Sequence, residues 1–174
     1  MSATELSAED TDQREAKIRE ATEQGLLVND AVLLFRKIVD RMPTTTWLLD
    51  AKRLVETDPV PEHEAGRKAD AKEELDDLHK DLESLSVDWV TGWYARGALY
   101  VTKDGAFEDF RRYVETLAPE LGALQLGGPG EAAPPEAIEK IREAIRPCAH
   151  RVVVEMLQSA HLVVSDAMKY ALSG

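Results

Sequence analysis

The segment RPCAHR, residues 146–151, places the only cysteine of the chain, Cys148, two positions before His150. A cysteine and a histidine form the nucleophile and the base in several classes of enzyme. Residues two positions apart on a helix point to different sides, so this pair cannot act together. Cys148 alone remains a candidate reactive thiol, because Pro147 predicts a helix start and the dipole of a helix N-terminus lowers the pKa of a thiol. The alternative is a buried and inert thiol, the commoner state of a free cysteine.

A cluster of carboxylates in KEELDDLHKDLESL is the second candidate for chemistry, and it includes Glu73, Glu74 and Asp77. Carboxylate oxygens bind Mg²⁺, and an all-α nucleotide pyrophosphohydrolase would hold the ion with acids from adjoining helices. Such a site requires a second acidic motif on a facing helix, whereas the other inward-facing stripes of this sequence are apolar. The pattern therefore favours a solvated outer helix face. We assign no catalytic residue, metal ligand or cofactor, and keep the Mg²⁺-dependent hydrolase as an alternative.

The aromatic segment WVTGWYARGALY is the third candidate. Helical spacing puts Trp89, Trp93 and Tyr100 on one side, with Arg96 within reach of the rings. Trp, Tyr and Arg dominate the energetics of protein interfaces, which favours a partner-binding surface. The same residues also suit the core of a small bundle with few aromatic side chains, so both interpretations stay open.

The elements that position these residues are helices. Apolar residues recur at intervals of three and four, and no pair of segments shows the alternation of paired strands. The sequence predicts an all-α, multi-helix bundle of about five to seven helices without a significant sheet. Residues 1–11 are expected to form a frayed acidic N-terminus, and residues 12–174 a single domain with a Gly/Pro-rich loop at 119–135.

The last helix is predicted to run without interruption from Pro147 to about Leu172. On its wheel Val163 falls on the arc that faces the core, and Leu162 falls in the polar arc as an exposed residue. His150 and His161 lie about three turns apart, too far for two ligands of one metal ion.

The charge of the chain limits its partners. The net charge is −12, and such a surface repels phosphate backbones, so nucleic acid is not an expected partner. Residues 56–88 contain twelve Asp or Glu against four Lys or Arg, a balance of −8. No run approaches the roughly 20 apolar residues of a membrane span. The polar N-terminus resembles no secretory signal, so a cytoplasmic location is expected.

These observations favour a non-catalytic helical module that binds another protein as an adaptor, regulatory subunit or neutralising partner. Its acidic face suits a partner with a basic surface. The near-heptad spacing over residues 65–89 is also compatible with self-association as a homo-oligomer. A small-molecule sensor with an apolar pocket near the tryptophans is a third hypothesis. The candidate partner-binding residues are Trp89, Trp93, Arg96, Tyr100, Glu73, Asp77 and Leu162.

Overall fold

The computed structural model describes residues 8–97, 106–124 and 133–173. Within these ranges the chain forms seven α-helices, two short 3₁₀ helices and no strand. The all-α class is confirmed, and the helical elements are more numerous than the five to seven expected. They are α1 (Ala8–Arg41), α2 (Thr45–Glu56), η1 (Glu62–Glu64), α3 (Ala65–Gly97), α4 (Ala106–Leu117), η2 (Pro119–Ala123), α5 (Pro135–Ile145), α6 (Ala149–Ser159) and α7 (Asp166–Ser173).

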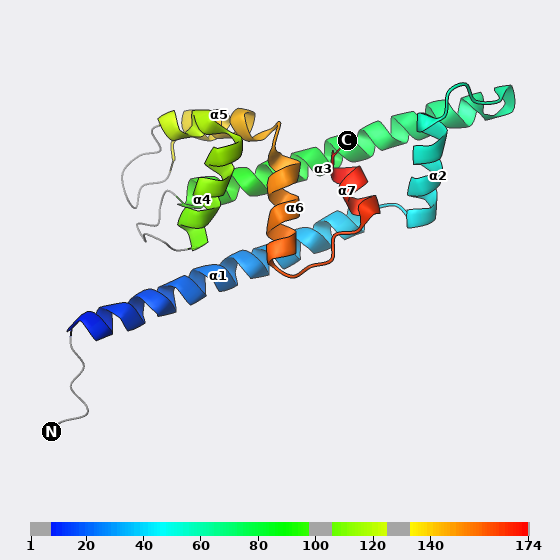
Figure 1. The fold of residues 1–174 in the computed structure, drawn as a ribbon. Helices are drawn as coiled ribbons and strands as arrows, with labels where there is room; N and C mark the ends of the chain where they lie inside the picture. Colours follow the sequence, from blue (N-terminus) through cyan, green and yellow to red (C-terminus); the bar gives the residue numbers. More distant parts are fainter. Residues whose placement is uncertain (1–7, 98–105, 125–132, 174) are drawn as a thin grey trace.

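The long helix α3 lies at the centre of the molecule and packs against α2, α4, α5, α6 and α7. Figure 1 shows α1 and α3 as two long helices that run in opposite directions, with α2 beside the first part of α3. Because α3 has neighbours on several sides, its buried residues are spread around the helix instead of forming one stripe. They are Ala71, Leu75, Leu82, Ser86, Val87, Val90, Thr91, Trp93 and Tyr94.

The apolar seam expected over residues 65–89 lies largely inside the chain. Leu75 and Leu82 are buried in the core, and Leu78 and Leu85 are half-buried against it. Other helices of the same chain therefore cover much of the seam. Leu78 and Leu85 keep part of their surface exposed, and self-association of the chain stays a prediction.

The last helix is not continuous, contrary to the sequence prediction. α6 ends at Ser159, and His161 follows with a φ of 62° in the left-handed region. The N–H of Leu162 donates to the carbonyl of Leu157 at 3.0 Å, and that of His161 donates to Gln158 at 2.9 Å. This pair of bonds is a Schellman motif, which closes a helix and turns the chain away. α7 then begins after Ser165, whose hydroxyl accepts a hydrogen bond from the N–H of Met168 at 3.1 Å.

This break corrects the positions predicted on one helical wheel. Leu162 is half-buried against the core, since the residue after the left-handed position packs back on the helix end. Val163, expected to face the core, is 84% exposed.

The ends of the chain and the long connection differ in detail from the expectation. α1 begins at Ala8, so residues 8–11 of the expected frayed segment are helical, and residues 1–7 lie outside the described part. The N-terminal part of α1 extends beyond the other helices (Figure 1). The Gly/Pro-rich stretch 119–135 begins with η2, whose Leu121 is buried. Residues 125–132 of this stretch are not among those described.

Candidate binding groove

A groove lies between the corner that joins α1 to α2 and one face of α3. Its cavity volume is about 720 Å³, within the range of about 300 to 1,000 Å³ typical of ligand pockets. Half-buried apolar side chains and carboxylates both line it. The residues are Arg41, Met42, Pro43, Thr44 and Trp47 from the corner, and Glu74, Asp77, Leu78 and Asp81 from α3.

Local sequence signals form the corner. Pro43 lacks the N–H that a further helical turn would use, so α1 ends at Arg41. Thr44 then caps α2: its hydroxyl accepts a hydrogen bond from the N–H of Trp47 at 3.2 Å. The chain turns within three residues, and the buried Leu48 holds α2 against the core.

The charges of the groove are only partly compensated. Arg41 Nε lies 3.0 Å from Asp81 Oδ2, so these two charges form an ion pair. Glu74 and Asp77 are exposed and form no ion pair within the described residues. The groove therefore carries two uncompensated negative charges beside the half-buried apolar residues Trp47 and Leu78.

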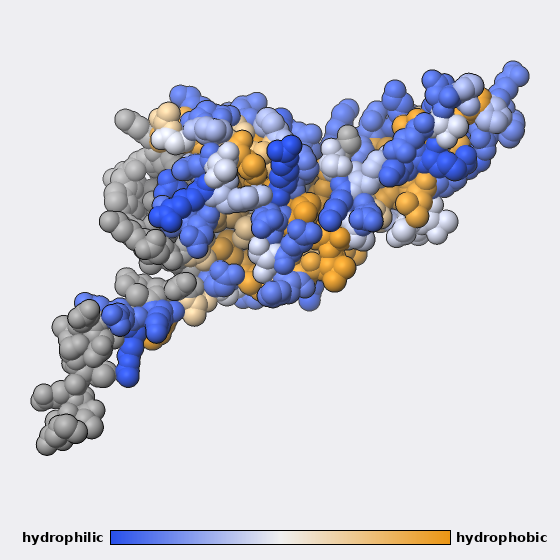
Figure 2. Space-filling model, in the orientation of Figure 1, coloured by the Kyte–Doolittle hydropathy of each residue, from blue (hydrophilic) through white to orange (hydrophobic). Residues whose placement is uncertain are grey.

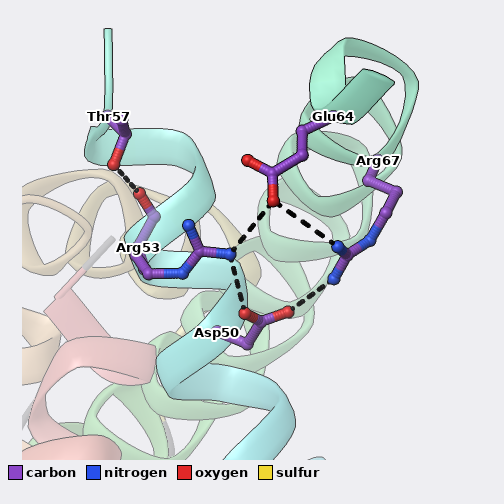
Figure 3. A network of polar contacts seen from close by, with 5 residues as sticks. All are labelled: Asp50, Arg53, Thr57, Glu64 and Arg67. Carbon is purple, nitrogen blue, oxygen red and sulfur yellow. Dashed lines mark hydrogen bonds and ion pairs between the residues drawn. The ribbon is translucent and has the colours of Figure 1, made fainter. Parts of the chain in front are cut away.

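Four alternating charges hold α2 to the start of α3 (Figure 3). Arg53 lies 3.1 Å from Asp50 and 3.8 Å from Glu64, measured between guanidinium nitrogen and carboxylate oxygen. Arg67 lies 2.9 Å from Asp50 and 3.9 Å from Glu64. The hydroxyl of Thr57 also donates to the carbonyl of Arg53 at 2.6 Å, at the end of α2. We call Asp50, Arg53, Glu64 and Arg67 the charge ring. A network of this kind fixes relative orientation better than an isolated surface ion pair does.

The end of the molecule that contains α2 and the first part of α3 is strongly polar. Figure 2 shows hydrophilic residues over most of its surface, with only small apolar patches between them. Residues 56–88, which include the first part of α3, contain twelve Asp or Glu against four Lys or Arg, and such an excess of negative charge attracts cationic ligands and raises their rate of encounter. The groove residues Glu74, Asp77 and Asp81 belong to this acidic segment.

The aromatic candidates Trp89 and Trp93 lie in and against the core. Trp93 is 3% exposed and stacks on Phe107 with ring centroids 5.1 Å apart. Trp89 is half-buried and meets Phe110 edge-on at 6.0 Å. These contacts join α3 to α4. Trp93 therefore lies in the core of this structure, and its role in partner binding stays a prediction.

The other predicted partner-binding residues divide into three groups. Asp77 lines the groove, while Glu73 is exposed on α3 outside it. Leu162 follows the end of α6 and is half-buried against the core. Tyr100 and the side chain of Arg96 lie outside the described residues.

Cys148 has the environment of an inert thiol. It precedes α6, as Pro147 predicts, but it is buried beside the core. Burial, with a smaller contribution from the carboxylate of Glu120, raises the pKa of the thiol. This direction is opposite to the one expected for a reactive cysteine at a helix start.

A second cavity, of about 320 Å³, lies where α3, α6 and α7 meet. His79 and His150 both line it. His79 Nδ1 is 2.7 Å from the carbonyl of Ala171, which joins α3 to α7. Burial, and secondarily Arg151, lower the pKa of His150. Within the described residues no three His, Cys, Asp or Glu side chains gather in a way that could hold a metal ion.

Trp47 and Leu78 lie on the apolar stripes of their helices, and this position does not distinguish a core residue from one that lines a groove. Their spacing on amphipathic helices is the same whether a neighbour covers them fully or only in part. The sequence does indicate the corner that forms one wall of the groove, because in the MPTT segment, residues 42–45, a proline followed by a capping threonine predicts a tight corner between two helices.

Comparison with protein-family models, with curated proteins and with solved structures finds no match for this chain. The fold and the groove define an all-α protein with an acidic, partly apolar groove at a helix corner. None of the helices in the described ranges combines the length and apolar character that a membrane span requires.

Proposed function

We propose that this chain is a non-catalytic helical module that binds a basic protein in the cytoplasm, as an adaptor, regulatory subunit or neutralising partner. The observation that carries the proposal is the groove, where Glu74 and Asp77 lie beside the apolar surface of Trp47 and have no ion-pair partner in the part of the chain that the structure describes. Protein interfaces combine such half-exposed aromatic and apolar surface with charged rims. Complementary charge steers the encounter, so association should slow as salt screens the surface.

The test is capture followed by reconstitution. The full chain is immobilised and exposed to extract of the source cell at low and at moderate salt, and bound proteins are coupled to its carboxylates with a carbodiimide. We expect a basic protein whose lysines cross-link to the acidic face, and whose purified form binds with a rate that falls with salt. Recovery of the chain alone, or of partners that bind equally well at every salt concentration, would contradict the proposal.

A second candidate, a small-molecule sensor, draws support from the size of the groove, which falls in the range of small-ligand sites. Its location differs from the one expected, since the groove adjoins Trp47 and not Trp89 or Trp93. The check is a metabolite panel monitored by tryptophan fluorescence, with a Trp47→Phe variant as control. A response that persists in this variant would place the ligand elsewhere.

The Mg²⁺-dependent hydrolase has less support. Glu74 and Asp77 face Met42, Pro43 and Trp47 across the groove, and these side chains provide no carboxylate. The third acid that lines the groove, Asp81, is paired with Arg41. Release of phosphate or pyrophosphate from a nucleotide panel with Mg²⁺, abolished by Glu74→Ala, would restore this alternative.

A further inference from the structure

We infer that the groove receives a basic segment of the partner protein, in which one arginine or lysine side chain meets Glu74 and Asp77 and an adjoining apolar side chain contacts Trp47. This inference rests on the proposed function and specifies the chemistry of the partner. The volume of the groove, about 720 Å³, is large enough to hold several side chains. Its two kinds of surface require an occupant that is both cationic and apolar.

The charge balance selects a cation. Arg41 is the basic side chain that lines the groove, and its ion pair with Asp81 leaves two carboxylates for the occupant. A second copy of this chain fits poorly, because two molecules with a net charge of −12 repel one another. A segment rich in Lys or Arg gains attraction from the two groove carboxylates and from the surrounding acidic surface.

The apolar surface selects a segment with a large side chain beside the cation. Met42, Trp47 and Leu78 are each half-buried against the core, so part of each remains in contact with solvent. Covering this surface is favourable, and the indole ring of Trp47 also accepts a cation over its face. The aliphatic stems of lysine and arginine pack on such surfaces while their charged ends reach a carboxylate.

The groove is preformed, which lowers the cost of binding. Leu48, Ala51 and Leu54 bury one face of α2 in the core. The charge ring joins the other end of α2 to α3 (Figure 3). Since both walls are held by contacts within the chain, a partner does not have to order them on binding.

The experiment uses the full chain and an array of 12-residue peptides in which Lys or Arg and Leu or Phe are permuted over all positions. The test variant is Glu74→Gln with Asp77→Asn. The matched control is Glu73→Gln with Asp76→Asn, which removes the same charge from exposed positions of the same helix outside the groove. We expect the test variant to weaken the best peptide about five- to tenfold and the control to change it less than about twofold, given the usual range for exposed ion pairs.

A fluorescence measurement adds a readout that charge alone would not change. Peptide binding should shift the tryptophan emission of the parent chain, and Trp47→Phe should remove the shift while thermal melting shows that the variant remains folded. Equal weakening by the test and control variants would overturn the inference, as would equal binding of peptides with glutamine in place of the basic residues. So would a dimer of the parent chain that the test variant dissociates, or free argininamide that binds as tightly as the peptide.

The outcomes separate the two proposals. If a reconstituted basic partner binds the parent chain and keeps its affinity for the test and Trp47→Phe variants, the groove inference fails and the proposed function stands. If the chain captures no basic partner and no basic peptide binds, both fail.

Discussion

The hydroxyl of Tyr94 provides a specific test of how α3 is joined to α4. Tyr94 is fully buried, and its hydroxyl donates to Glu115 Oε1 at 2.8 Å. The guanidinium of Arg111 lies over the ring at 5.6 Å. Tyr94→Phe keeps the ring and its packing, and removes this hydrogen bond to a charged group together with a longer one that the hydroxyl donates to the carbonyl of Leu121 at 3.5 Å.

The structure sets the size of the effect. A hydrogen bond to a charged group contributes about 1.5 to 3 kcal/mol to stability. The side chain of Glu115 is 31% exposed and lies 3.7 Å from Arg111, so water and Arg111 partly replace the lost donor. We therefore expect Tyr94→Phe to lower the free energy of unfolding by about 1 to 2 kcal/mol. For a chain of this length the melting temperature should fall by about 2 to 8 °C.

The assay is urea unfolding followed by circular dichroism, with Glu115→Gln and the double variant completing a cycle. The slope of the free energy against urea should not change, because the exposed area stays the same. A non-additive term of about 1 kcal/mol is expected between the two positions. The reasoning is refuted if Tyr94→Phe changes stability by less than about 0.3 kcal/mol, or if the two substitutions add.

The pH dependence gives an independent signature. Burial, and then the hydrogen bond to Glu115, raise the pKa of Tyr94 above its ordinary value. The unfolded chain loses this proton near pH 10 while the folded chain keeps it, so the contribution is present below about pH 10 and declines as the pH rises. The stability advantage of the parent over Tyr94→Phe should therefore shrink above about pH 10. A difference that stays constant from pH 8 to 11 would contradict this assignment.

Three further outcomes are expected. Cys148 should resist alkylation near neutral pH until the chain unfolds, because burial raises the pKa of its thiol; rapid labelling of the native protein would contradict this. The free energy of unfolding of the parent chain should fall below about pH 6.5, and in His150→Gln it should fall less steeply, because the folded chain disfavours the charged imidazole that the unfolded chain accepts. Urea unfolding measured over this pH range would contradict this if the two proteins lost stability equally. His161→Gly should raise the free energy of unfolding by about 0.5 to 1 kcal/mol by relieving a left-handed conformation, and a loss of stability in the same assay would show that the imidazole contributes more than the strain.

Much of the local structure could be predicted because its causes are local. Pro43 and Thr44 mark the α1–α2 corner, and Pro135 opens α5, since each acts on the backbone of its own turn. The boundary between α5 and α6 at Pro147 follows from the same rule. The break after α6 was missed because a histidine occupies the left-handed position that glycine usually takes, although Ser165 followed by Asp166 was a readable signal for a new helix start.

The candidate site was predicted only in part. Asp77 and the acidity of α3 were identified, because charge is a property of composition. Trp93 was considered both as a core and as a binding residue and lies in the core, while Trp47, which was not a candidate, lines the groove. The helical wheel places both on apolar stripes, and it contains no information on which neighbour covers each stripe.

By itself, the sequence determined the all-α class, the corner at Pro43, the helix boundary at Pro147 and the acidity of residues 56–88. These features depend only on residue periodicity, backbone restrictions and composition within a few turns. Only the tertiary structure decided that α2 lies beside α3, that Trp93 is covered by α4, and that Glu74 and Asp77 share a groove with Trp47. The physical reason is that burial and ion pairing depend on contacts between helices distant in the chain, and the periodicity of a single helix does not specify its neighbours.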